Sequence, residues 1–313
     1  MSLGALALCN GVLYVARCTH ATHVRAFDWD GTPLGEGFRA RGPQGEEVGA
    51  SAMCVDRDHR LWVADREGSR VLGYSVHGRL VACIESVGQA KRRRLDLTRE
   101  TAGDHPGALW QTSGLGLYER FDEDGQGCIE LYVGCAGVRR HALQRYSDSG
   151  QCLDSLRSEG LAGRCFDDLC SLACADGRLW VAESGAKRIQ VFRRGEFHVA
   201  WRFPSASGAA LVPIAVAALP DGRAVVAARS PLEVVFLVDR DGRWVHTIAQ
   251  GPDVGAQGRA TNQAGISHVV ALAAQAGDSD GTTRIAVMDQ DGERVQVFTL
   301  GGRCFGALTD LPG

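Results

Sequence analysis

The sequence lacks any run of apolar residues long enough to span a lipid bilayer. Its first residues, MSLGALALCNGVLYVAR (1–17), also lack the positively charged start of a secretory signal. Neither sign of charge dominates, since the formal net charge is -3, and this excludes a bulk attraction to nucleic acid or to anionic membranes. We therefore expect a cytoplasmic protein that does not insert into membranes.

Long segments with a period of 3.6 residues are missing as well, which disfavours helical repeats and α/β barrels. The eleven cysteines stand at irregular spacings in a chain of 313 residues. A chain of this size does not need disulfides to be stable, so we interpret the cysteines as reduced thiols.

The main positive feature of the sequence is a repeat. RLWVAD (60–65) and RLWVAE (178–183) are nearly identical, and four further copies of an apolar run contain the same valine. Most steps between these valines are 45 to 48 residues, and two longer steps indicate insertions. The six valines are Val15, Val63, Val133, Val181, Val226 and Val287.

Other short β-rich runs flank each copy and are joined by Gly and Asp turns, which gives four strands per unit. The repeated run is apolar throughout, as expected of a strand that is buried on both faces. The first strand of each unit is rich in small residues, which fit around a crowded axis. The sequence therefore predicts an all-β fold, a six-bladed β-propeller with four antiparallel strands per blade, as one domain over 1–313. The blades are expected at about 3–38, 49–84, 113–156, 168–203, 212–248 and 266–309, with an insertion at 85–112.

Three segments resemble a known repeat family. VAESGAKRIQVF (181–192), VADREGSRVLGY (63–74) and RVQVFTLGG (294–302) are similar to NHL repeats. The resemblance is strong in the second, fourth and sixth units and weak in the third and fifth. It implies a six-bladed propeller but no single activity, because the family includes scaffolds, RNA binders and enzymes.

An acid and an arginine stand five residues apart in three units: Asp65 and Arg70, Glu183 and Arg188, Asp289 and Arg294. The acid ends one strand and the arginine begins its antiparallel neighbour, so each pair can clamp the turn between them. The other three units carry Arg17, Cys135 and Ala228 at the acid position.

These turns, together with the connections between blades, lie at one end of a propeller channel, where ligands usually bind. At that end we expect a basic face. Solvated turns with partner acids such as Glu46, Glu47 and Glu100 are the alternative, and the insertion with its KRRR run can equally be a solvated loop. The turns at the opposite end are rich in aspartate. The candidate ligand-binding residues are Arg17, Arg66, Arg92, Arg93, Arg94, Trp110, Arg139, Arg140, Lys187, Arg229 and Arg259.

Candidate metal ligands are few. Cys18, His20 and His23 in CTHATH could be gathered by a turn, and Asp168 and His268 stand near the starts of inner strands. Cys170 and Cys174 lie too far apart along one strand to share a zinc ion. The DxDG tetrads lack the further ligands of an EF-hand, and no nucleophile elbow is present.

The preferred interpretation is a non-catalytic NHL-like propeller that acts as a binding or scaffold module through its basic face. We expect no cofactor, a monomer, and a protein or an acidic or phosphorylated ligand as partner, with RNA less favoured. The alternative is a metal-assisted lyase or hydrolase, using zinc or calcium, at the mouth of the channel.

Overall fold

The protein is described by a computed structural model that covers residues 3–18, 21–86, 105–121, 127–158, 165–205, 208–229, 233–251, 265–289 and 293–309. The regular secondary structure of these residues consists of strands. Among them, no helix is long and apolar enough to cross a membrane. The part of the insertion at 87–104, and with it Arg92, Arg93, Arg94 and Glu100, lies outside the described residues, as do His20 and Arg259.

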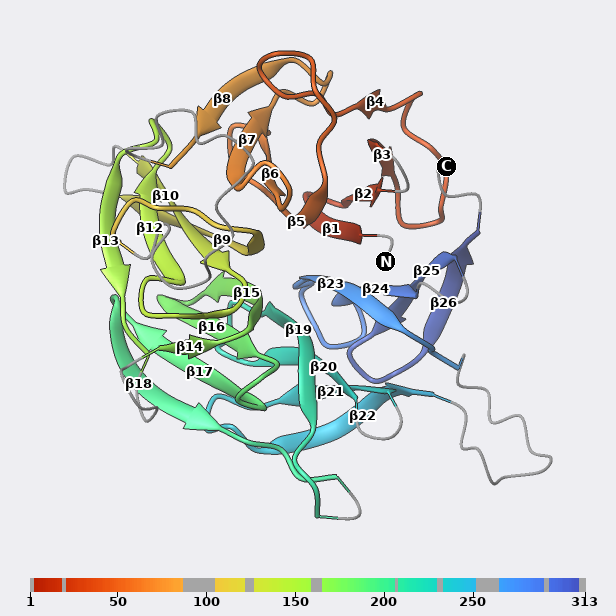
Figure 1. The fold of residues 1–313 in the computed structure, drawn as a ribbon. Helices are drawn as coiled ribbons and strands as arrows, with labels where there is room; N and C mark the ends of the chain where they lie inside the picture. The colour runs from red at the N-terminus through yellow and green to blue at the C-terminus, as the bar shows by residue number, and fades with distance from the viewer. Residues whose placement is uncertain are drawn as a thin grey trace.

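Six four-stranded antiparallel sheets surround a central axis and form a six-bladed β-propeller, as predicted (Figure 1). The innermost strands, in blade order, are β1 (Leu3–Cys9), β5 (Ala50–Val55), β9 (Thr112–Phe121), β15 (Leu169–Ala175), β19 (Val212–Ala218) and β23 (Val269–Gln275). The second strands are β2 (Val12–Cys18), β6 (Leu61–Asp65), β10 (Gly127–Cys135), β16 (Arg178–Glu183), β20 (Ala224–Arg229) and β24 (Arg284–Asp289).

The outer half of each blade follows the same order. The third strands are β3 (Thr22–Phe27), β7 (Arg70–Tyr74), β12 (Leu143–Ser147), β17 (Arg188–Arg193), β21 (Glu233–Val238) and β25 (Arg294–Thr299). The outermost strands are β4 (Phe38–Arg39), β8 (Leu80–Ile84), β13 (Cys152–Leu156), β18 (Glu196–Trp201), β22 (Trp244–Gln250) and β26 (Cys304–Leu308). A separate two-stranded sheet pairs β11 (Val138–Arg139) of blade 3 with β14 (Phe166–Asp167), just before blade 4.

The six repeated valines occupy equivalent places in the second strands. Every residue of β6 and of β16 is buried, because each of these strands has a blade on both sides. In each blade the valine pairs with one residue of the innermost strand, for example Val15 with Leu6 and Val63 with Met53. The repeat in the sequence therefore corresponds to the same position of the second strand in every blade.

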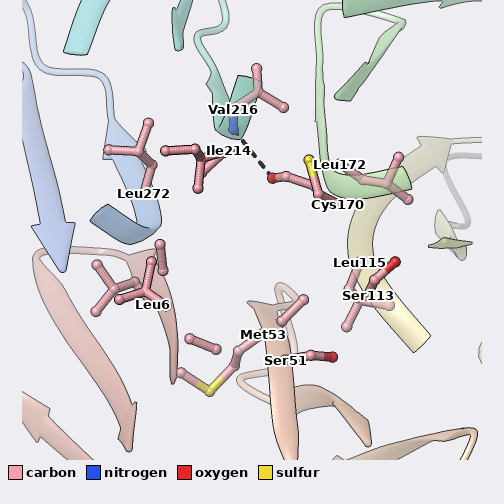
Figure 2. Close-up of a pocket in the computed structure, with 16 residues that line it drawn as sticks. Leu6, Ser51, Met53, Ser113, Leu115, Cys170, Leu172, Ile214, Val216 and Leu272 are labelled. Atoms are coloured by element: carbon pink, nitrogen blue, oxygen red, sulfur yellow. Dashed lines mark hydrogen bonds between the residues drawn. The ribbon is translucent and has the colours of Figure 1, made fainter. Parts of the chain in front are cut away.

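The valine partners form a ring around the axis that we call the waist ring: Leu6, Met53, Leu115, Leu172, Val216 and Leu272. Labelled side chains of this ring surround one central space in Figure 2. The expectation that only small side chains fit near the axis is therefore incomplete. Small residues flank each ring position, as Ala5 and Ala7 flank Leu6, and they leave room for one large apolar side chain per blade.

Side chains on the innermost strands tie neighbouring blades together. The Ser51 hydroxyl of blade 2 donates to the Thr112 carbonyl of blade 3 (2.6 Å), and the Ser113 hydroxyl donates to the Leu169 carbonyl of blade 4 (2.5 Å). Between blades 4 and 5, the Val216 amide donates to the Ser171 hydroxyl (3.2 Å), which is the dashed line in Figure 2. The small polar residues near the axis therefore satisfy backbone groups that face the next blade.

The ring closes between blade 1 and blade 6, and we call this contact the closure seam. Each of these blades takes its four strands from one continuous stretch of chain. Leu13 and Val15 of blade 1 belong to the same buried cluster as Ala286 and Met288 of blade 6. The Gly11 amide also donates to the Gln275 side-chain oxygen at 3.0 Å. The seam is thus held by side-chain packing and a few polar contacts, without strand exchange.

Candidate functional site

The predicted acid–arginine pairs are formed in all three blades. Arg70 Nε lies 2.8 Å from Asp65 Oδ2, and Arg188 Nε lies 2.6 Å from Glu183 Oε2. In blade 6, Arg294 and Asp289 are 3.3 Å apart. All three acids are fully buried. These pairs therefore clamp their turns from within the protein, and their acids are not available to a ligand.

Each clamp acid has a second function that the sequence did not indicate. Asp65 also accepts a hydrogen bond from the amide of Gly49 (3.0 Å), and Glu183 accepts one from the amide of Asp167 (3.0 Å). Both amides lie just before the innermost strand of the same blade. The acid thus fixes the turn and the point at which the chain enters the blade.

The blades without a clamp acid use other contacts. Arg17 reaches across the closure seam to Glu293 (3.0 Å). Cys135 Sγ accepts the Trp110 amide hydrogen bond at 3.4 Å. In blade 5, Arg229 pairs in register with Glu233, whose carboxylate accepts from the Val269 amide of blade 6 (2.5 Å). In the three blades without a clamp acid, the residues of these turns therefore contact other parts of the propeller.

We call the end of the channel that carries the clamped turns and the blade-to-blade connections the connection face, and the other end the opposite face. Several cations of the connection face are paired within the protein. Arg39 and Arg41 both contact Glu47, at 2.7 and 2.5 Å, and Arg70 contacts Glu46. The alternative of turns with nearby partner acids is therefore correct for this part of the face.

The opposite face is not a purely acidic surface. Its aspartates alternate with arginines: Arg60 contacts Asp56 (2.7 Å) and Asp148 (3.1 Å), and Arg223 contacts Asp280 (2.6 Å). The turns of this face are rich in aspartate, as the sequence indicates, and the arginines that follow these turns pair with several of the aspartates. The charge difference between the two ends is correspondingly smaller.

One part of the connection face is different, and we call it the blade 3 projection: Trp110, Val138, Arg139 and Arg140. The turn between β10 and β12 is long enough to form β11, which pairs Arg139 with Phe166 of β14. The Arg139 guanidinium lies 5.1 Å from the centre of the Trp110 ring, in cation–π geometry. Val138 beside it is 70% exposed, and Arg140 is exposed as well.

Blade 4 borders the projection. Asp168 accepts from the Gly137 amide (3.3 Å) and from the Ser184 hydroxyl (2.7 Å), and its own amide donates to the Gly137 carbonyl. Lys187 is exposed at the end of the adjacent turn. Of the remaining sequence candidates in the described chain, Arg66 lies half-buried in blade 2 and Arg229 is exposed in blade 5. The structure therefore brings Trp110, Arg139, Arg140 and Lys187 to neighbouring blades, and it leaves Arg17, Arg66 and Arg229 elsewhere on the ring.

The candidate metal ligands that the structure describes, His23, Asp168 and His268, are not brought together. In the part of the chain that the structure describes, no three His, Cys, Asp or Glu side chains are placed to hold an ion. Burial, Arg25 and Arg39 lower the pKa of His23, and positive neighbours that disfavour an imidazolium also disfavour a cation. Asp168 is occupied by the contacts to blades 3 and 4. The side chains of Cys18 and His20 lie outside the described part.

His268 is exposed one residue before the innermost strand β23, with a backbone φ of 51°, and it acts electrostatically on the carboxyl of Glu233. Burial raises the pKa of the Glu233 carboxyl, while His268 and Arg229 act in the other direction. The Glu233 carboxylate also accepts the Val269 amide, so it lies at the junction of blades 5 and 6 within the electrostatic reach of His268.

The channel consists of two cavities that share the waist ring. The cavity towards the connection face has a volume of 60 Å³, and the cavity towards the opposite face has a volume of 240 Å³. Among the described residues, no charged side chain lines either cavity.

No protein-family model and no curated protein matches the chain. A streptogramin B lyase structure is similar at 11% identity and a TM-score of 0.55, with 99% of this chain and 83% of that chain covered. A catalytically inactive virginiamycin B lyase from Staphylococcus aureus, solved with Quinupristin, is similar at 11% identity and a TM-score of 0.56, with 99% and 85% covered. At this identity the likeness concerns the fold. The chain is a six-bladed β-propeller that is similar in fold to these two lyases, and NHL-repeat membership stays a prediction.

Proposed function

We propose that the protein is a non-catalytic binding module that holds an acidic segment of a partner protein on the blade 3 projection. The observation that carries this proposal is Val138, an exposed apolar side chain on a two-stranded sheet, one residue before Arg139, whose guanidinium stacks on Trp110. Aromatic residues and arginine are enriched where protein partners bind, and rigid presentation lowers the entropy cost of binding.

The charge around the projection favours a protein segment over a polyanion. Arg139, Arg140 and Lys187 supply positive charge, but Asp167 and Asp168 lie on the same part of the face. RNA binding needs a continuous basic surface that neutralises several phosphates, and alternating charges do not provide one. A peptide that combines carboxylates with an apolar side chain matches both the cations and Val138.

A test uses a fluorescein-labelled peptide of alternating Asp and Glu with one central Leu, and measures its binding by fluorescence anisotropy. The double variant V138A/R139A removes the apolar contact and one cation, and we expect at least a tenfold loss of affinity. The matched control V76A/R79A removes an exposed valine and an arginine from a turn on the opposite face, and it should bind as the wild type does.

Two results would overturn the proposal. Equal affinities in both double variants would show that the projection is not the binding surface. Turnover of quinupristin by the wild type, lost in His268→Ala, would instead favour the lyase interpretation, which the half-buried Glu233 beside His268 and the fold of the neighbours support.

A further inference from the structure

We propose that the 240 Å³ cavity towards the opposite face, which we call the lower cavity, is a binding site for a small uncharged molecule with an apolar body and at least one hydrogen-bonding group. This site is separate from the blade 3 projection and does not depend on the proposed function.

The size of the lower cavity is sufficient for a ligand. An engineered cavity of about 150 Å³ in another protein binds benzene, so 240 Å³ accommodates a bicyclic molecule. The waist ring separates this cavity from the 60 Å³ cavity above it. In that upper cavity the hydroxyls of Ser51, Ser113 and Ser171 already form hydrogen bonds between blades, and its volume is too small for a bicyclic molecule.

The side chains around the lower cavity are neutral. Leu8, Val55 and Leu117 line it below the waist ring, and Cys54 and Cys174 are free thiols in its wall. Burial raises the pKa of both thiols, so each stays protonated at neutral pH. Moving a charged group into such surroundings is costly, and the wall contains no opposite charge to offset that cost.

The backbone supplies hydrogen-bonding groups. Each innermost strand pairs with only one other strand, so amides and carbonyls along its inner edge take no part in the hydrogen bonding of the sheet. Small side chains at Ala173 and Gly116 keep these edges accessible from the cavity. A ligand with an amide, a hydroxyl or a ring N–H can pair with this edge, whereas a purely apolar molecule would leave it unsatisfied.

The test compares two probes of nearly the same shape, indole-3-carboxamide and indole-3-carboxylate, by isothermal titration calorimetry at neutral pH. We expect saturable binding of the carboxamide and at least a tenfold weaker affinity for the carboxylate. Ala173→Leu and Ala274→Leu each enlarge a residue that lines the lower cavity and should each weaken carboxamide binding at least tenfold.

The matched control is Ala271→Leu, which makes the same change in the upper cavity and should leave carboxamide binding unchanged. Circular dichroism and the melting temperature establish that each variant is folded, and Ala274→Leu replaces Ala173→Leu as the test if the latter does not fold. The proposal is overturned if the carboxamide does not bind, if the carboxylate binds equally well, or if a folded lower-cavity variant binds as the wild type does.

Discussion

At the scale of single residues, the charged side chains of the connection face fall into two groups, those in buried ion pairs and those in exposed ion pairs. Asp65 and Arg70 are only 1% and 9% exposed, whereas Glu293, which pairs with Arg17, is 70% exposed. An exposed ion pair contributes about 0–1 kcal/mol, but removing one partner of a buried pair costs about 3–5 kcal/mol, because the other charge is left without compensation.

Replacing Asp65 by Ala should therefore destabilise the protein by about 1–3 kcal/mol, since the Gly49 amide loses its acceptor and Arg70 keeps only its contact to Glu46. Urea unfolding monitored by circular dichroism measures this loss. The control is Glu293→Ala, which should change the free energy of unfolding by about 1 kcal/mol or less. A small effect of Asp65→Ala would mean that the clamp does not stabilise the turn.

The clamps were predictable from the sequence because an acid and an arginine five residues apart face one another across any antiparallel turn of this length. Val138 was not predictable in the same way. Its significance depends on β11 pairing with β14, and the two short strands are separated by 26 residues or more of chain that gives no pairing signal. The only indication in the sequence was that the turn between the second and third strands is longer in blade 3 than in blade 2.

At the scale of elements, each innermost strand combines small residues with one large apolar residue, which belongs to the waist ring. Their small residues were recognised in the sequence as a consequence of crowding at the axis. The waist ring was not predicted, because attention to the small residues left the one large residue between two small ones unconsidered. The hydrogen bonds that Ser51 and Ser113 donate to the next blade were not predicted either, because the sequence indicated only that these strands contain small residues.

Ser113→Ala should destabilise the protein by about 1–3 kcal/mol, because the buried carbonyl of Leu169 loses the donor that satisfies it. Chemical unfolding of Ser147→Ala, which alters an outer turn between β12 and β13, provides the comparison and should show a change within about 0.5 kcal/mol. Equal effects of the two substitutions would contradict a tie between blades 3 and 4.

At the scale of the whole molecule, the closure seam differs from the other contacts between blades. All of them depend on side-chain packing, but blades 1 and 6 are not adjacent in sequence, so no short connection holds them together. Six units of similar sequence were enough to predict the number of blades. The contacts at the seam were not predictable in detail, because Met288, which lies against Gly4 of β1, stands where the other five units have Ala or Gly after the repeated valine.

Met288→Ala should cost about 2–5 kcal/mol and should selectively lower the hydrogen-exchange protection of β1, β2 and β24. Leu169→Ala is the comparison: it truncates a buried side chain between blades 3 and 4, which the chain connects directly. Its loss of protection should stay local to β9 and β15. If hydrogen-exchange protection decreased equally in all six blades of the Met288 variant, the closure seam would not open independently of the other contacts between blades.

The order of the sheets along the chain also affects biosynthesis. Blade 1 emerges from the ribosome first, but the blade that covers Leu13 and Val15 is completed only after residues 266–309 have been translated. Until then one flank of the first blade is apolar and uncovered, and aggregation competes with folding for nascent chains of this kind. Chaperone protection of partly synthesised chains should therefore matter more for this protein than its final stability alone would indicate.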